Sequence, residues 1–342
     1  MSARRKQQGK QHPSRRYSRL IAFATTIVLV AYATFAVWFV HHPRAWLADR
    51  ERILPSALFA SLIQTGSQLG DLTDGLSLTG HDVCYEYDEE APVGSVFFAG
   101  APRRTGSPAP RDLVELDRGD FVVGWSPSLG HPVWCAYHVT PEARFESGKR
   151  PNFSRDPEVP TAPSPGAYER SGYDRGHLAP NYAMETRYGP EIQKLTFRMT
   201  NIAPQSPALN RGVWRDVEHR IADLWTARYG ELWVVVGCIS NPRKETLSGT
   251  AIDVPDRFYQ LIVAQEGLDV RVQAVLFEQT VKAGAWAARH LITVDELEAL
   301  TGLDFLPELP RFIQDPLEAE LPTRLWPVRW QDLLQQFLLR FN

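Results

Sequence analysis

The sequence predicts an α+β domain that follows a membrane-spanning N-terminal segment. Short β-rich runs separated by turn residues alternate with a few helical segments, which is typical of an α+β fold. One uninterrupted apolar run lies near the start of the chain. With 342 residues, 44% of them apolar and 23% charged, the chain can bury a sizeable core.

The first forty residues predict a membrane anchor. Residues 1–20 carry seven Lys or Arg, and Ile21–Val40 follows with no charged residue. Twenty apolar residues can cross a hydrocarbon layer of about 30 Å as a helix. Because basic flanks remain in the cytoplasm, we expect a single-pass membrane protein with a cytoplasmic tail (1–20) and a transmembrane helix (21–40) embedded in the lipid bilayer. The rest of the chain would then lie on the non-cytoplasmic side. A bacterial envelope is favoured, and a mitochondrial inner membrane, which shares the orientation rule, stays open.

Two other interpretations of this segment stay open. Ala31-Tyr32-Ala33 and Ala36 offer cleavage patterns of a signal peptide, although the apolar run is longer than usual and bulky Trp38 and Phe39 follow. A buried core helix would leave the flanking basic cluster unexplained. The anchor and the signal peptide both export the rest of the chain.

Beyond the anchor, residues 41–80 predict a helical juxtamembrane stalk, and residues 81–310 a folded domain. LWVVVGCI is continuously apolar, as expected of a central strand buried on both faces. Helices are expected over Pro190–Met199 and Leu209–Tyr229 and from Thr293, where Glu296 completes a capping box and Gly302 ends the helix. Residues 311–342 form a proline-punctuated C-terminal tail. The other expected strands are SVFFAG, DFVVGW, PVWCAYHVT, RFYQLIVAQ and VRVQAVLFEQ.

Charge and cysteine content set few limits on function. The net charge is −3, and residues 141–230 hold thirteen Lys or Arg against eleven Asp or Glu, so a polyanionic substrate is neither supported nor excluded. Cys84, Cys135 and Cys238 form no C-x-x-C pair, which argues against a structural zinc site. Cys84 and Cys135 could pair outside the cytosol, or all three could be buried as free thiols.

Polar residues gather in two places that suggest chemistry. The stretch GYDRGHLAPNYAM contains Asp174, Arg175, a glycine that permits close backbone approach, and His177. A single histidine in a polar loop is usually solvated or hydrogen-bonded. The second cluster runs from TNIAPQ to LNRG, where Asn210 begins a helix and Glu218 follows eight residues later on the same side. The alternative is a capping asparagine and a solvated glutamate.

Together, DRGHLAP, TNIAPQ and LNRGVW-x-x-x-E resemble the DNA/RNA non-specific endonucleases, a ββα-metal nuclease family of secreted bacterial enzymes and the mitochondrial endonuclease G group. The resemblance extends over about residues 84–310. It implies a ββα-metal (His-Me finger) domain with a central mixed or antiparallel sheet. His177 would lie on a strand or loop and Asn210 on the helix of the finger.

The resemblance also implies a role for each motif residue. His177 matches the general base, and Asn210 matches the side chain that holds one Mg²⁺, with Mn²⁺ as the alternative. Glu218 matches the acid that orients a metal-bound water. Arg175 matches an arginine that clamps phosphate, and Asn201 an asparagine that helps to hold the site.

Two further assignments are looser. Asp174 is expected to support the site rather than to ligate the ion. Arg150 is the nearest candidate for a second substrate-binding arginine, with plain surface exposure as the alternative. The chain departs from the family at Gln260, where many relatives carry lysine, which would weaken a distal phosphate contact. It also carries Cys238 where a proline is common.

These features predict a Mg²⁺-dependent, sugar-non-specific endonuclease that hydrolyses DNA and RNA outside the cytosol. A membrane-anchored nucleic-acid-binding protein with little cleavage activity is the main alternative, and intact His177, Asn210 and Glu218 speak against it. A hydrolase of another phosphodiester and assembly into a homodimer also stay open.

Overall fold

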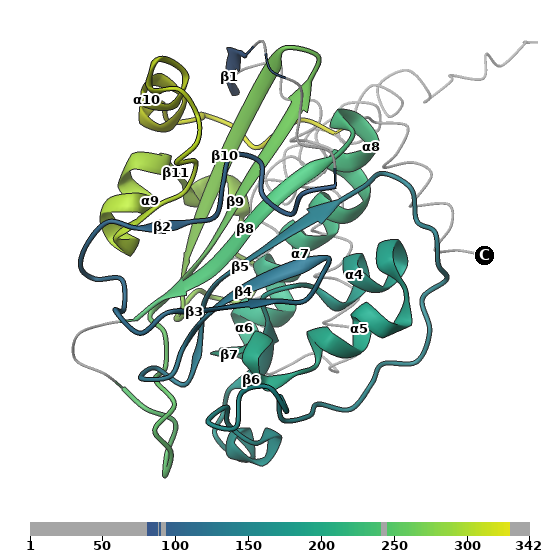
Figure 1. Cartoon of the computed structure of the whole chain (residues 1–342), viewed down its shortest axis with the longest axis vertical. Coiled ribbons are helices and arrows are strands. Elements are labelled where there is room, and N and C mark those ends of the chain that lie inside the picture. Colours follow the sequence, from purple (N-terminus) through teal and green to yellow (C-terminus); the bar gives the residue numbers. More distant parts are fainter. Residues whose placement is uncertain (1–80, 88, 90–93, 241–244, 329–342) are drawn as a thin grey trace, which may run out of the picture.

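An eight-stranded antiparallel sheet runs through the middle of the domain (Figure 1). The structure is a computed structural model that describes residues 81–87, 89, 94–240 and 245–328. The strand order is β1-β10-β9-β8-β5-β4-β3, and β11 pairs with β10. The strands of this sheet are β1 (Val83–Glu86), β3 (Val114–Asp117), β4 (Phe121–Ser126), β5 (His131–Val139), β8 (Leu232–Ile239), β9 (Arg257–Glu266), β10 (Asp269–Glu278) and β11 (Leu291–Ile292).

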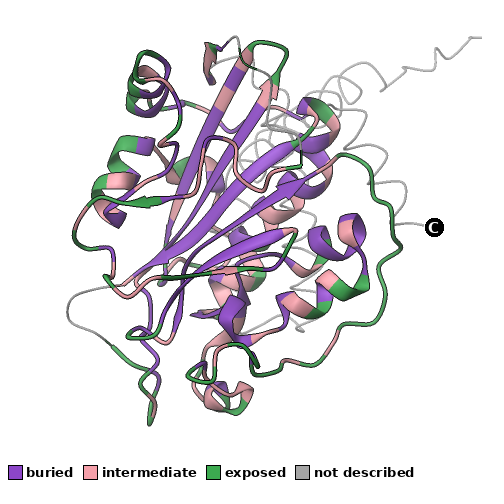
Figure 2. Ribbon diagram, in the orientation of Figure 1, coloured by how far each residue is buried: buried purple, intermediate pink, exposed green. Residues whose placement is uncertain are grey.

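Strand β8 lies near the centre of the sheet, as its continuous apolar sequence predicts. It pairs with β5 on one side and β9 on the other, and all eight of its residues are buried. Figure 2 shows the same burial along β5 and β9. Because neighbouring side chains of a strand point to opposite faces, β8 supplies core residues to two separate layers. The α+β class with an antiparallel sheet is therefore confirmed.

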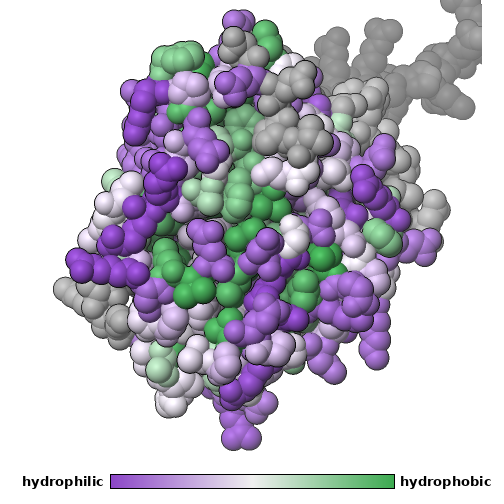
Figure 3. Space-filling view, viewed as in Figure 1, coloured by the Kyte–Doolittle hydropathy of each residue, from purple (hydrophilic) through white to green (hydrophobic). Residues whose placement is uncertain are grey.

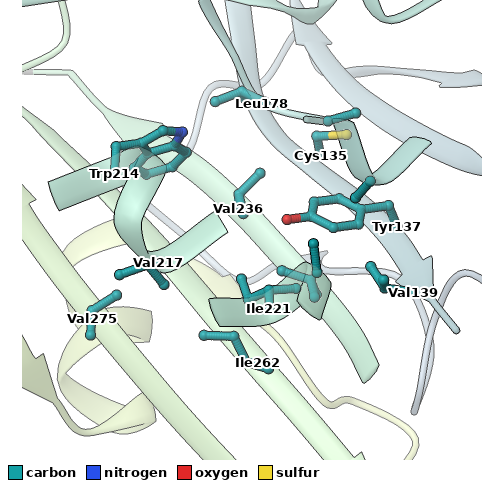
Figure 4. Packing of buried hydrophobic residues seen from close by; sticks show 14 of the residues in the cluster. Cys135, Tyr137, Val139, Leu178, Trp214, Val217, Ile221, Val236, Ile262 and Val275 are labelled. Atoms are coloured by element: carbon teal, nitrogen blue, oxygen red, sulfur yellow. The ribbon is translucent and has the colours of Figure 1, made fainter. Parts of the chain in front are cut away.

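A helical layer covers one face of the sheet and carries the polar motifs (Figure 1). Its core includes Tyr137 of β5, Val236 of β8 and Trp214, all packed together in Figure 4. Trp214 belongs to the helical arm, which is the continuous run of helices from α6 to α8 (residues 207–229). The elements of this layer are η1 (Pro165–Tyr168), α4 (Asn181–Tyr188), α5 (Pro190–Thr196), η2 (Met199–Asn201), α6 (Pro207–Leu209), η3 (Asn210–Trp214), α7 (Arg215–His219), η4 (Arg220–Trp225) and α8 (Thr226–Tyr229). A small hairpin of β6 (Asp174–His177) and β7 (Ile202–Gln205) lies beside them.

The opposite face is covered by α9 (Val294–Thr301), α10 (Arg311–Ala319) and the segment that contains β2 (Arg103–Arg104). Strand β2 pairs with β12 (Leu303–Asp304), and η5 (Ala287–His290) precedes β11. The predicted capping box is confirmed, because Thr293 accepts from the Glu296 amide over 3.0 Å and Gly302 ends α9 in the left-handed conformation. Figure 3 shows apolar side chains gathered in the middle of this side of the molecule, with polar ones around them.

Several local predictions were wrong. SVFFAG (95–100) forms bends rather than a strand, and α4 was not predicted. The helix expected over Leu209–Tyr229 is interrupted: η3 and η4 are π-helical, and Gly212 leaves the helical region with φ −106° and ψ −120°.

The predicted single-pass membrane placement is corrected. In the part of the chain that the structure describes, no helix has both the length and the apolar composition needed to cross a bilayer. The expected anchor (21–40) and stalk (41–80) lie outside the described residues.

The three cysteines are free. Cys84 on β1 and Cys135 on β5 are four strands apart in the sheet, which places them roughly 19 Å from each other at the usual strand spacing. A disulfide needs Cα atoms within about 7 Å, so these two cannot pair in this fold.

Residues 311–328, which the sequence placed in a C-terminal tail, pack against the domain. Trp326 is fully buried and contacts the rings of Trp225 and Tyr229 at centroid distances of 5.7 and 5.0 Å. The Trp225 indole N–H also donates to the Trp326 carbonyl oxygen over 2.9 Å. The remaining tail residues, 329–342, lie outside the described residues.

Candidate active site

The β6–β7 hairpin places the D-R-G-H motif. Asp174 pairs with Gln205 at one end of the hairpin, and His177 pairs with Ile202 at the other. Side chains alternate along a strand, so Arg175 and His177 lie on one face of β6 and Asp174 on the other. Contacts agree with this alternation: Arg175 and His177 both touch the ring of Phe153.

Gly176 is required by a close approach inside the hairpin. A Cβ at this position would lie 2.1 Å from Oε1 of Gln205, which is fully buried. Any larger residue would push the Gln205 side chain away or open the hairpin. The glycine of the motif therefore maintains the spacing between β7 and β6, the strand that carries both Asp174 and His177.

Asn210 is bound to the motif through Asp174. Its Nδ2 donates to Oδ2 of Asp174 over 2.9 Å, and Arg211 donates to both carboxylate oxygens over 2.7 and 2.6 Å. Burial raises the pKa of Asp174, but the hydrogen bonds from Arg211 and Asn210 outweigh it, and the net pKa is lowered. Asp174 is thus an anionic acceptor that fixes the amide of Asn210.

The local sequence explains why Asn210 occupies this position. Ser206 caps α6 by accepting from the Leu209 amide over 3.4 Å, and Pro207 begins the helix. The Asn210 amide continues the turn by donating to the Ser206 carbonyl over 2.9 Å. The kink at Gly212 follows at once, so Asn210 and Arg211 stand at the end of a short helical turn, next to the hairpin.

Glu218 lies further along the helical arm and is only partly exposed. Its Oε1 accepts from the Trp214 indole N–H over 3.0 Å. Burial raises the pKa of Glu218 to about 8, despite opposing effects from Trp214, Arg215 and Arg150. The kink at Gly212 lies between Asn210 and Trp214, so the expected continuous i, i+4, i+8 face is present only from Trp214 to Glu218.

His177 is buried among aromatic rings. It is 9% exposed, with ring centroids 4.7 Å from Phe197 and 5.3 Å from Phe153. Within the described residues, its Nε2 has no hydrogen-bond partner. Burial and the charge of Arg150 lower the pKa of His177 to about 3, so the imidazole is neutral at pH 7.

The two candidate phosphate-binding arginines differ in their surroundings. Arg175 donates from Nε and one Nη to the Pro165 carbonyl over 3.0 and 2.7 Å, which ties it to η1. Arg150 is exposed, with its guanidinium 5.7 Å from the centroid of Phe197. The positive charge of Arg150 lowers the pKa of both His177 and Glu218, so Arg150 lies near both side chains.

Asn201 is a brace rather than a group free to meet substrate. Its Oδ1 accepts from the Ala179 amide over 2.9 Å, and its Nδ2 donates to the carbonyls of Ala179 and Thr196 over 3.0 and 2.9 Å. The side chain is 1% exposed. These bonds fix the backbone directly after His177 to the end of α5.

Hydrogen bonds thus connect Asp174 with Asn210 and Arg211. A separate hydrogen bond connects Trp214 with Glu218. Among the described contacts, His177 does not touch Asn210; the two are connected through β6, which carries His177 and the partner of Asn210. Asp174 and His177 are three residues apart on that strand, roughly 10 Å between Cα atoms.

The donor atoms suit Mg²⁺ better than a soft metal. Asn210 commits its Nδ2 to Asp174, so its Oδ1 remains for a cation, and a neutral oxygen ligand with open positions is what Mg²⁺ accepts. In the described residues, a cluster of three ligand side chains occurs elsewhere, at Asp295, Glu298 and Glu318 around α9 and α10. The candidate site therefore offers one protein ligand rather than a closed cage.

Sequence reasoning missed the residues that surround His177. Phe153 and Phe197 come from two separate segments and have no periodic pattern that would indicate a shared role. Asp156 was also missed, although it is 1% exposed and accepts from Thr200 over 2.6 Å and from Arg198 over 3.2 Å. The available signal in the sequence was an acid within a proline-rich loop.

Known proteins resemble this chain over the same region. The family model of the DNA/RNA non-specific endonucleases matches residues 100–312. The nuclease of Nostoc sp. is 29% identical over 223 residues, covering 61% of this chain and 79% of that protein. The nuclease of Serratia marcescens is 30% identical over 219 residues, covering 60% and 80%. The mitochondrial nuclease of Saccharomyces cerevisiae is 28% identical over 230 residues, covering 60% and 69%.

Among solved structures, a chain in the crystal structure of the EndoG/EndoGI complex matches with a TM-score of 0.53 at 23% identity. The match covers 58% of this chain and 87% of that one, and it shows a shared fold. The relatives above are named as nucleases, one of them mitochondrial, and none of the three names describes a membrane protein.

Proposed function

Since this chain belongs to the DNA/RNA non-specific endonuclease family and is an endonuclease, we propose that it hydrolyses both DNA and RNA with Mg²⁺ as cofactor. In this proposal His177 is the general base and Asn210 holds the metal ion. The observation that carries it is the 2.9 Å bond from Asn210 to Asp174, which connects the helical arm to the strand that ends in His177.

His177 would take a proton from the attacking water. Its neutral state at pH 7 supports this role, because a base has to be unprotonated before the reaction. A pKa of about 3 makes a weak base in the free enzyme. An incoming phosphate would offset the charge of Arg150 and thereby favour protonation of the imidazole, so substrate binding itself would strengthen the base.

Asn210 would coordinate Mg²⁺ through Oδ1, with its amide fixed by Asp174. The chemistry that the bound ion supplies is stabilisation of the charge on the phosphate and on the leaving 3′-oxygen. Glu218 would orient water in the site once it is ionised. Arg150 and Arg175 would contact phosphate oxygens, and recognition limited to phosphate and sugar carries no base information.

Digestion of supercoiled plasmid and of single-stranded RNA by the full chain tests this proposal. In Mg²⁺ both substrates should be cut internally. EDTA, His177→Ala and Asn210→Ala should each slow cleavage by roughly 100-fold or more. Asn152→Ala, which alters an exposed asparagine of the loop before the motif, is the matched control and should cut like the wild type.

Different failures identify different errors. Cleavage of DNA alone would refute sugar non-specificity, and full activity of His177→Ala would refute the assigned base. If Asn210→Ala cut normally at every Mg²⁺ concentration, the metal would be held elsewhere. Plasmid that is bound but uncut in Mg²⁺ would contradict cleavage itself. Homodimer formation remains a separate prediction, which light scattering of the purified chain checks.

A further inference from the structure

Two phenyl rings surround the proposed base, and each of them contacts a guanidinium group. The rings of Phe153, Phe197 and His177 lie within 5.3 Å of one another, centroid to centroid. The guanidinium of Arg175 lies 5.3 Å from the centroid of Phe153, and that of Arg150 lies 5.7 Å from the centroid of Phe197. Each phenyl ring therefore contacts both the imidazole and one arginine guanidinium.

A catalytic histidine is commonly oriented by a hydrogen bond from its second ring nitrogen to a carboxylate or a carbonyl. Within the described residues, His177 has no such partner at Nε2. Its orientation must then come from packing, and the two phenyl rings supply the contacts that fix it. Phe197 is buried and also supports the core, whereas Phe153 is partly exposed and stands on a loop.

We propose that Phe153 is a positioning residue, whose ring fixes the imidazole of His177 in its productive orientation. This inference rests on the proposed role of His177 as the base. It goes beyond that role because it assigns the orienting function to an aromatic ring.

The segment around Phe153 is anchored in a way that suits this task. The Ser154 amide donates to the Phe197 carbonyl over 3.1 Å, and the Ser154 carbonyl accepts from the Met199 amide over 3.0 Å. Two residues further on, the buried carboxylate of Asp156 binds Arg118, Arg198 and Thr200. Phe153 thus stands on a fixed backbone, and its ring has little freedom to leave His177.

Two guanidinium groups lie next to the phenyl rings that contact His177. Arg150 lowers the pKa of the imidazole through its charge, while Arg175 lies next to the Phe153 ring. Removing the ring would admit water to the imidazole and free its orientation. The neutral state of His177 would then be favoured less strongly, and the reacting nitrogen would spend less time in line with the phosphate.

The test compares Phe153→Ala and Phe153→Trp with the wild type in the full chain. Phe153→Ala should lower kcat roughly 10- to 100-fold and leave KM within about twofold, as expected of a misplaced catalytic group. Its His177 signal in NMR should titrate with a midpoint moved from about 3 toward 6.5. Phe153→Trp retains a ring and should recover most of kcat. The His177→Gln spectrum assigns the signal.

Phe145→Ala is the matched control, because this phenylalanine lies on the same segment, is 45% exposed and has no contact with His177 among the described residues. It should titrate and cut like the wild type. If Phe153→Ala is too unstable to study, Phe153→Leu replaces it, and the same loss of kcat with rescue by tryptophan is expected.

The inference would be overturned if Phe153→Ala showed the wild-type His177 titration and the wild-type kcat. It would also be overturned if Phe153→Trp were as slow as Phe153→Ala. The proposed function can fail separately. If His177→Ala cut DNA normally, the base would be another group, while the NMR titration of Phe153→Ala would still decide whether this ring holds the imidazole.

Discussion

The indole N–H of Trp214 donates to Oε1 of Glu218 over 3.0 Å, one helical turn apart on the arm that follows Asn210. This bond holds the carboxyl in a partly buried place, where its pKa rises to about 8. The carboxyl of Glu218 is therefore protonated at neutral pH in the free enzyme. This arrangement makes stability and activity respond in opposite ways to one substitution.

Glu218→Gln should raise stability and lower activity. An unfolded glutamate has a pKa of about 4.3, so between that value and about 8 the folded state binds more protons, and the free energy of unfolding falls as pH rises. The neutral amide removes this penalty, on the order of 2 kcal/mol at pH 8 after allowance for solvent screening. Thermal melts at pH 5 and pH 8 check it, and kcat should fall about 100-fold. A variant that melts below the wild type at pH 8 would contradict the raised pKa.

Asp174→Asn should weaken Mg²⁺ binding without removing the ligand. The hydrogen bond to Asn210 would lose its charged acceptor, and such supporting groups commonly change metal affinity by about 10- to 100-fold. The Mg²⁺ concentration for half-maximal cleavage measures the effect, and kcat at saturating Mg²⁺ should change less. Asp315→Asn, in an exposed ion pair on α10, is the control. An unchanged Mg²⁺ requirement would show that Asp174 does not fix the ligand.

His177→Gln should make the fold less sensitive to acid. The pKa of His177 is about 3 in the folded protein, against about 6.5 in an unfolded chain. Between these values the unfolded state binds more protons, so the free energy of unfolding falls as pH falls, by up to about 2 kcal/mol at pH 5. Melting temperatures at pH 7 and pH 5 should differ less in His177→Gln than in the wild type. His81→Gln, at an exposed histidine, should behave like the wild type.

Asn201→Ala should act through stability. Three hydrogen bonds between its amide and the backbone of Ala179 and Thr196 would be lost in a fully buried place. Unsatisfied buried groups cost about 1–3 kcal/mol each, so a loss of about 3 kcal/mol in the free energy of unfolding is expected from urea titration. Activity should fall as well, because the backbone after His177 is released. An Asn201→Ala protein of wild-type stability and low kcat would instead favour contact with substrate.

Several elements could be predicted because their signals are local. Strand β8 is apolar along its whole length, and Thr293 and Glu296 lie at the spacing of a capping box. The motif residues also stand in short local runs, but their roles came from the resemblance to the nuclease family and stay predictions. The sequence could not show that Asn210 bonds to Asp174, because these two residues are 36 positions apart and meet only after the hairpin and the helical arm have packed together.

Other roles depend on burial, which motif spacing does not reveal. Asn201 looks like a site residue in the sequence, but its side-chain amide is hydrogen-bonded to backbone groups on both its oxygen and its nitrogen. Gln260 was expected to affect a distal phosphate contact, yet it is fully buried in the middle of β9, paired with Val236 and Val275. A side chain in that place cannot reach a phosphate at the surface. The kink at Gly212 likewise depends on how the arm fits over the sheet.

The burial of Trp326 has a practical consequence for anyone who wants to shorten the protein. The family match ends at residue 312, but the indole of Trp326 seals the rings of Trp225 and Tyr229 from water, and its backbone N–H donates to Gln273 over 2.7 Å. Truncation at residue 312 would expose the aromatic rings beside α8 to water and favour aggregation. A C-terminal cut has to come after residue 328.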